Sequence, residues 1–237
     1  MLIRYSYGVT VIHGHEERTR LDRDAAAAYE VVKAGGVAVI PTDVSYGMIA
    51  TTERGVRRIY ELKGRPLSKA CITVSTPAIF ADVALPLDGP LHRWVDDIRA
   101  RTPIAVVTPL NPASRLLAPL TEYTRTQATQ DATIATFFNA GDVVVRVAEL
   151  AFADGALVIG SSANISGTGN NCSFAEIPAS IVDGADLAID YGHVRYANTE
   201  RLSTTILDLT TGNFVRKGVN YALILSSWDE HRRAARV

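Results

Sequence analysis

Cysteine is scarce in this sequence: Cys71 and Cys172 lie far apart and form no CxxC pattern. Two such residues do not make a disulfide framework, so a reducing cytoplasm is the expected compartment. Long apolar runs are also missing, because no stretch approaches the roughly 20 residues that a membrane-spanning helix needs. The first residues lack the apolar core of a secretory signal. We therefore expect a cytoplasmic protein that does not enter a membrane.

Net charge is nearly absent, because 24 Lys and Arg residues balance 25 Asp and Glu residues. Bulk electrostatics provide no attraction to nucleic acid or to an anionic membrane, although a local basic cleft is compatible with this balance. The common phosphate-binding motifs are missing as well: no GxxxxGK[ST] occurs, and no GxGxxG opens a helix after a strand. The five histidines lie in no nucleophile-elbow context, so the sequence does not predict a Ser-His-Asp hydrolase.

Apolar residues are plentiful, at 47% of 237 residues, which is enough for the core of one large domain. Helical and strand patterns alternate along the chain, and this alternation predicts an α/β fold with substantial parallel pairing. The patterns predict helices at 22–36, 53–64 and 91–101, and strands at 37–41, 70–75, 104–109, 143–148, 156–162, 187–192 and 204–210.

No internal repeat or shift in composition marks a second domain. We expect an N-terminal arm over 1–21, one domain over 22–220 and a short basic tail over 221–237. Residues 111–142 are rich in Thr, Pro and Ala and show no clear periodicity. This segment is predicted to be an inserted excursion that acts as a lid or binds a partner.

Polar clusters follow two of the predicted strands. PTDVSYG comes after VAVI, and GSSANISGTGN comes after ALVI. Open α/β sheets bind ligands at the carboxyl ends of their strands, so the two clusters predict one shared site. The second cluster supplies hydroxyls, amides and glycines that suit a nucleotide or phosphate, although ordinary loops use the same residues.

Three cations are candidates for binding an anion. Lys63 and Arg65 flank Gly64 where a helix is predicted to end, so both can face one anion. The tripeptide alone equally fits a solvated turn that favours the helix dipole. Arg146 interrupts VVVRV, which the sequence predicts to be a buried strand. A buried Arg needs a partner, and a phosphate or carboxylate suits its geometry.

Together these segments resemble the YrdC-like family, the threonylcarbamoyl-adenylate synthases. PTDVSYG, KGRP, VVVRV, GSSANISG, STTILDL and VRKG occur in the order and approximate spacing of that family, over roughly residues 22–220. The resemblance implies a single-domain, open, twisted mixed sheet with flanking helices and a basic central cavity. It also implies an enzyme that condenses threonine or a similar amino acid with bicarbonate and ATP. The products would be pyrophosphate and threonylcarbamoyl-AMP, which serves tRNA adenosine modification together with partner proteins.

The resemblance also assigns roles to individual residues. Lys63 and Arg65 would be catalytic and hold the phosphates, Arg146 would bind phosphate or the carbamate, and Ser162 and Asn164 would contact the nucleotide. Thr42 would hold threonine with Ser45 and Tyr46 beside it, while Ser203 and Arg216 would complete the anion-binding wall. Mg²⁺ is expected with ATP. No acidic pair in the sequence identifies metal ligands, so phosphates and water would hold this ion.

The sequence departs from the family pattern on the amino-acid side. Where the family has PTDT-V-YGL, this chain has Val44, Ser45 and Met48; Ala70 and Cys71 replace Pro-Leu, and Ala148 replaces the Pro of VRVP. This pattern fits an altered substrate. Two alternatives therefore stay open: a related enzyme that forms a carbamoyl- or acyl-adenylate of another small molecule, and a non-catalytic module that binds double-stranded RNA. The near-zero net charge counts against the RNA-binding module.

Overall fold

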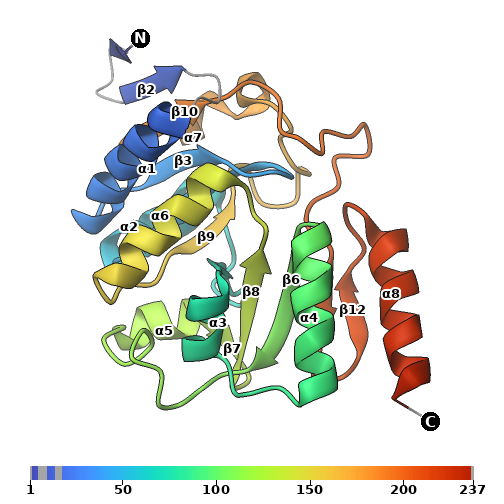
Figure 1. Cartoon of the computed structure of the whole chain (residues 1–237). Helices are drawn as coiled ribbons and strands as arrows, with labels where there is room; N and C mark the ends of the chain where they lie inside the picture. The colour runs from blue at the N-terminus through green and yellow to red at the C-terminus, as the bar shows by residue number, and fades with distance from the viewer. Residues whose placement is uncertain (1, 5–9, 14–17, 236–237) are drawn as a thin grey trace.

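A computed structural model of the chain describes residues 2–4, 10–13 and 18–235. These residues form a mixed twelve-stranded sheet with helices packed against it (Figure 1). The predicted α/β class and the open mixed sheet are therefore confirmed. Within the same ranges, none of the helices has the length and apolar character needed to cross a lipid bilayer.

The strands follow one another across the sheet in the order β1-β2-β10-β3-β4-β9-β5-β8-β6-β11-β12, and β7 pairs with β8. Both parallel and antiparallel neighbours occur: β10 runs parallel to β3, and β4 runs antiparallel to β9. The strands are β1 Leu2–Arg4, β2 Thr10–His13, β3 Ala38–Pro41, β4 Tyr46–Ala50, β5 Ile72–Val74, β6 Ile104–Pro109, β7 Thr129–Gln130, β8 Thr133–Phe138, β9 Ile159–Ser162, β10 Leu187–Asp190, β11 Ile206–Asp208 and β12 Asn213–Arg216.

The helices include the three that the sequence predicts. They are α1 Arg18–Lys33, α2 Glu53–Lys63, α3 Pro77–Val83, α4 Gly89–Arg101, α5 Glu122–Ala128, α6 Asp142–Ala153, α7 Ala179–Val182 and α8 Tyr221–Ala234, with a 3-10 turn at Phe174–Glu176. Figure 1 shows α1 and α6 side by side, and both helices contact β3. Helix α2 instead contacts β4 and β9.

The end of α2 shows how the sequence positions site residues. Thr52 caps its N-terminus by accepting a hydrogen bond from the Gly55 N–H. Gly64 ends the helix with φ of 56°, a left-handed conformation that glycine adopts without a side-chain clash. The chain turns sharply there, so Lys63 stays buried on the helix while Arg65 leaves it.

The prediction of a buried strand over 143–148 is wrong, because these residues lie in α6. The apolar run has helical spacing: the buried positions are Val143, Val144, Val147, Ala148 and Ala151. Arg146 therefore lies on the exposed side of the helix. Its guanidinium pairs with Asp22 at 3.1 Å and with Glu149 at 3.0 Å.

The prediction of an inserted excursion is wrong for its last part, because β8 lies within the sheet between β5 and β6. The sequence TIATFF combines β-branched and aromatic residues, which suit a strand. Four of its residues are buried: Ile134, Thr136, Phe137 and Phe138. Residues 133–138 thus form part of the core and do not act as a lid.

The segment expected to be a basic tail contains the whole of α8, which packs against α4. The Trp94 and Trp228 rings lie 4.8 Å apart, and the Trp94 indole N–H donates to Ser227 Oγ at 3.0 Å. The two tryptophans belong to a second hydrophobic cluster with Phe138 and Leu207. Part of the expected N-terminal arm joins the sheet, because β1 pairs with β2 and β2 pairs with β10. Residues 1, 5–9 and 14–17 of the arm lie outside the described ranges.

Candidate functional site

Strand register gathers apolar side chains on one face of the sheet. Gly160 of β9 lies opposite Ile49 of β4 and Ile72 of β5. Val74 of β5 in turn lies opposite Phe137 of β8. Directly opposed residues point to the same side of a sheet, so these residues share one face.

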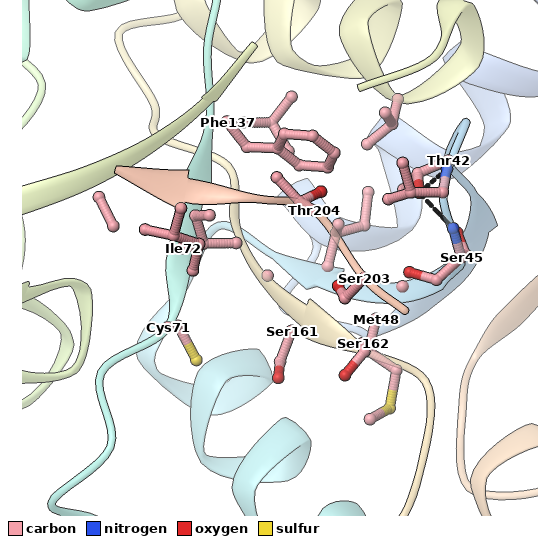
Figure 2. Close-up of a pocket in the computed structure, with 18 of the residues that line it drawn as sticks. Thr42, Ser45, Met48, Cys71, Ile72, Phe137, Ser161, Ser162, Ser203 and Thr204 are labelled. Atoms are coloured by element: carbon pink, nitrogen blue, oxygen red, sulfur yellow. Dashed lines mark hydrogen bonds between the residues drawn. The ribbon is translucent and has the colours of Figure 1, made fainter. Parts of the chain in front are cut away.

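A cavity of about 180 Å³, here called the apolar cavity, opens over this face (Figure 2). The turn before β4, the start of β11 and helix α6 complete its wall. The apolar residues whose side chains share this face or close over it are Val44, Ile49, Ile72, Val74, Ala135, Phe137, Val144 and Ile206. Residue 44 therefore does lie at the cavity, and it contributes a hydrocarbon side chain.

Three further residues reach the cavity mainly with backbone. Met48 and Ser161 are opposite each other and alternate with Gly47 and Gly160, so their side chains lie on the other face of the sheet. Cys71 precedes Ile72, and its thiol contacts the Tyr60 hydroxyl at 3.6 Å. Figure 2 shows the Ser161 oxygen and the Cys71 sulfur pointing away from Phe137. The cavity face is thus more apolar than the sequence pattern indicates.

A second cavity of about 310 Å³, here called the basic cavity, adjoins the first one. Arg65, Ser162, Ser203 and Arg216 line both cavities. Six cationic residues line the basic cavity: Lys63, Arg65, Lys69, Arg201, Arg216 and Lys217. Among the described residues, no Asp or Glu lines it. An uncompensated group of cations in a concave site attracts an anion.

Arg65 and Arg216 stand where the two cavities meet. Arg65 donates to the carbonyls of Lys69 and Ala70, at 3.1 and 2.6 Å, and Arg216 donates to the Thr204 carbonyl at 2.7 Å. Arg216 keeps contact with solvent, but the surrounding protein removes part of its hydration. This desolvation, with repulsion from Arg65, lowers the pKa of Arg216 to about 10. The Arg216 guanidinium remains charged at neutral pH, and both side chains have N–H groups left for an anion.

Lys63 is buried and bonded within the chain. Its ammonium donates to the Asn164 carbonyl at 2.7 Å, to Asn164 Oδ1 at 2.9 Å and to the Ser162 carbonyl. These bonds occupy its three N–H groups. Burial, followed by repulsion from Arg65, lowers the pKa of Lys63 to about 7. The geometry therefore makes Lys63 a tether that holds the loop after β9.

That loop shapes the wall of the basic cavity. Ser162 Oγ bonds Asn164 Oδ1, and Asn164 Nδ2 donates to the Ile165 carbonyl at 2.7 Å. Arg201 donates to the Asn170 carbonyl at 2.7 Å and to Asn171 Oδ1 at 2.8 Å. The Asn170 side-chain nitrogen is buried and has no hydrogen-bond partner within the described part of the chain. This nitrogen has almost no accessible surface, so a ligand does not reach it in this arrangement of the loop.

The Thr42 hydroxyl is fully used by its own turn. It donates to the Ser45 carbonyl at 2.6 Å and accepts from the N–H groups of Ser45 and Val44, at 3.1 and 3.3 Å (Figure 2). A hydroxyl has one donor and two acceptor sites, so no capacity remains for a substrate. Thr42 shapes the turn and does not offer its hydroxyl.

Tyr46 is also occupied, whereas Ser45 is not. The Tyr46 hydroxyl donates to the Gly192 carbonyl at 3.0 Å and accepts from the Tyr191 N–H at 3.0 Å, and burial raises its pKa. Tyr46 lies in the core and does not line either cavity. Ser45 lines the apolar cavity, and its hydroxyl makes no hydrogen bond to another described residue.

The structure thus gathers most of the residues that the sequence nominates. Lys63, Arg65, Ser162, Asn164, Ser203 and Arg216 surround the basic cavity, and Thr42 and Ser45 line the apolar one. Arg146 lines neither cavity. Sequence reasoning missed Lys69, Arg201, Lys217 and the apolar wall. Lys69 follows the KGRP segment by three residues and Lys217 lies within VRKG, but no sequence signal distinguishes Arg201.

The cavity residues do not build a site for Mg²⁺. Oxygen ligands, mainly carboxylates, hold this ion in proteins, and the described lining of the basic cavity has no carboxylate. No group of three or more His, Cys, Asp and Glu residues elsewhere in the described ranges is arranged to hold a metal. We therefore assign no metal-dependent step to these residues.

Comparison with known proteins gives one family and several similar structures. A family model for Sua5, YciO and YrdC proteins, whose description is "Telomere recombination", matches residues 30–218. A hypothetical protein of Streptococcus mutans UA159 superposes with a TM-score of 0.76 at 18% identity, over 93% of this chain and 95% of that one. E. coli YciO gives a TM-score of 0.67 at 21% identity, over 89% and 95% of the two chains.

P. abyssi Sua5 complexed with L-threonine gives a TM-score of 0.68 at 20% identity. The alignment covers 89% of this chain but 57% of that Sua5 chain. Among curated proteins, none matches this sequence. At these identities the structural similarities establish a shared fold.

Proposed function

This chain belongs to the Sua5/YciO/YrdC family, and we propose that it is a nucleotidyltransferase that uses ATP to form the adenylate of a small carbamate or carboxylate. The observation that carries the proposal is the junction of a basic cavity and an apolar cavity at Arg65 and Arg216. The basic cavity would hold the triphosphate, and the apolar cavity would hold the acceptor. The acceptor's anionic oxygen would then lie beside the α-phosphate.

In the form that the family suggests, the amine of threonine and bicarbonate give a carbamate and water. A carbamate oxygen then attacks the α-phosphorus of ATP, the bond to the β-phosphate breaks, and pyrophosphate leaves. The product is threonylcarbamoyl-AMP, which would serve tRNA adenosine modification. The structure of P. abyssi Sua5 with L-threonine supports an amino acid as the acceptor in this fold.

This chemistry demands cations and alignment more than a general base. The carbamate is already an anionic nucleophile, so the protein has to place it in line and neutralise charge on the phosphates. Arg65 and Arg216 are charged and stand at the junction. Lys63 would act as a positioning residue, since its N–H groups are bonded to the loop that carries Ser162 and Asn164.

A second candidate is a related adenylate-forming enzyme with another acceptor. The occupied Thr42 hydroxyl and the hydrocarbon of Val44 favour it, because both remove contacts that a polar amino acid would use. The geometry supports a double-stranded RNA module less, because the cations line a small cavity and not an extended groove that follows a duplex.

The test is release of pyrophosphate from ATP and bicarbonate with a panel of amino acids and simple carboxylates. We expect release that depends on one acceptor class, together with ATP binding that weakens as salt increases. Absence of both ATP binding and pyrophosphate release across the panel would show that the proposed function is wrong. RNA binding with a steep salt dependence and no ATP turnover would favour the RNA module.

A further inference from the structure

The apolar cavity carries information about the acceptor. We infer that it selects a small carboxylate with a branched hydrocarbon body, such as valine, over threonine. The inference rests on the proposed nucleotidyl transfer and names its substrate class. Figure 2 shows Phe137, Ile72 and Thr204 arranged around the space that this hydrocarbon would fill.

The wall at this end offers hydrocarbon and almost no hydrogen-bonding capacity. The side chains on the cavity face of β4, β5, β8 and β11 belong to Ile49, Ile72, Val74, Phe137 and Ile206. Val144 of α6 and Val44 of the turn close over them. A hydroxyl that leaves water for such a wall loses hydrogen bonds, whereas a methyl group gains contact without that cost.

The hydroxyls near this wall do not compensate. The Thr42 hydroxyl is occupied by Ser45 and Val44, as described above. The Thr204 hydroxyl is buried, with no partner in the described residues and with almost no accessible surface, so a ligand does not reach it. The Ser45 hydroxyl lies on the side of the cavity nearest Ser203, which also lines the basic cavity (Figure 2). It is placed for the anionic end of the acceptor.

Charge fixes the orientation of the acceptor. Arg65 and Arg216 are the cations that line the apolar cavity within the described ranges, and both stand at its junction with the basic cavity. A carboxylate or carbamate would bind there, because a guanidinium pairs with such groups through two parallel hydrogen bonds. The hydrocarbon body would then extend toward Val74 and Phe137.

Volume limits the size of this body. The apolar cavity measures about 180 Å³. In another protein, an apolar cavity of about 150 Å³ holds a benzene molecule, so the present one admits a body of about four to six carbon atoms. Counted with the α-carbon, the hydrocarbon bodies of valine and isoleucine have four and five carbon atoms and fit this limit.

Valine and threonine are isosteres, and comparing them tests the inference directly. Pyrophosphate release is measured with ATP, bicarbonate and each amino acid. We expect kcat/KM for valine to exceed that for threonine by about 10- to 100-fold, the range over which an apolar pocket rejects an added hydroxyl. Equal or better use of threonine would overturn the inference while leaving the proposed function standing.

A third acceptor identifies the reacting group. 3-Methylbutanoate has the hydrocarbon of valine but no amine, so it does not form a carbamate. Activity with this acid that exceeds activity with threonine, in the absence of bicarbonate, would support the hydrocarbon preference and show that the carboxylate itself is adenylated. Activity with valine that exceeds activity with threonine and requires bicarbonate would support the preference and show that the carbamate is adenylated.

Two variants link the preference to the cavity. Val44→Thr adds a hydroxyl to the cavity wall, so the ratio of valine to threonine activity should fall toward one. Val95→Thr is the matched control, because Val95 is equally buried but lies in the second cluster, on α4. This control should keep the wild-type ratio. A ratio that changes equally in both variants would contradict the inference.

Binding measured by calorimetry separates the inference from the proposed function. If none of the acceptors supports pyrophosphate release, the proposed nucleotidyl transfer is wrong. The affinities of valine, 3-methylbutanoate and threonine then decide the inference alone. Tighter binding of the two hydrocarbon compounds would support it. Tighter or equal binding of threonine would overturn it.

Discussion

Replacing Arg216 with Gln tests whether the junction of the two cavities binds the nucleotide. The Arg216 guanidinium donates to the Thr204 carbonyl at 2.7 Å, and Arg216 lines both cavities. A hydrogen bond between a charged group and an anion contributes about 1.5–3 kcal/mol. Since each 1.4 kcal/mol is about tenfold in affinity, Arg216→Gln should weaken ATP binding by about 10- to 150-fold.

The free protein should tolerate this change. Repulsion from Arg65 is one cause of the lowered pKa of Arg216, so the substitution removes an unfavourable interaction together with one hydrogen bond. We expect the free energy of unfolding to change by less than about 1 kcal/mol. Urea denaturation of the same samples measures this free energy.

Arg146→Gln is the matched control. Arg146 lies on the exposed side of α6 and pairs with Asp22 and Glu149. Exposed ion pairs stabilise by about 0–1 kcal/mol, so the variant should fold normally and bind ATP as the wild type does. Calorimetry with ATP compares the two variants. If Arg146→Gln lost as much ATP affinity as Arg216→Gln, the assignment of the nucleotide to the basic cavity would be refuted.

Two further predictions concern the core. Because burial lowers the pKa of Lys63 from 10.5 to about 7, the unfolded chain binds a proton between these values that the folded chain lacks. The free energy of unfolding should therefore rise as pH increases from about 7 toward 10.5, and urea melts of Lys63→Met should lack this rise; an equal rise in the variant would contradict the assignment. Trp228→Ala should lower the free energy of unfolding by about 3–5 kcal/mol, because Trp228 packs on Trp94 in the second cluster. A change below about 1 kcal/mol would show that α8 is dispensable.

Much of the sheet was predictable because its strands are short, apolar and bounded by polar turns. The strands predicted at 37–41 and 104–109 illustrate this, and they correspond to β3 Ala38–Pro41 and β6 Ile104–Pro109. The run VVVRV misled the prediction because β-branched residues favour strands, and five residues are too few to separate a strand from a buried helix. The longer run DVVVRVAELAFA shows the helical period, with Val143, Val147 and Ala151 buried. Only the longer run of twelve residues distinguishes the helix from the strand that VVVRV alone suggested.

The candidate site was predictable where chemistry is local in sequence. Lys63 and Arg65 flank a glycine, and Ser162 and Asn164 follow a strand, so short motifs revealed them. The apolar cavity was not predictable, because its wall depends on register: Ile72 meets Gly160, and Val74 meets Phe137, only after the strands pair. The state of the Thr42 hydroxyl likewise depends on turn geometry, which its residue type does not specify.

The two cavities are built from different parts of the fold. Cations of the basic cavity come from the loops and element ends around Lys63, Arg201 and Arg216, where a side chain can change without repacking the sheet. The wall of the apolar cavity comes mainly from strand interiors, where Gly160 of β9 packs closely against β4. A Cβ atom at Gly160 would lie 3.0 Å from the Met48 carbonyl oxygen and 3.2 Å from Ile49 Cγ2. The sheet therefore does not accept a larger residue at position 160, and a change at the acceptor end that keeps the volume, such as Val44→Thr, is the one that the wall tolerates.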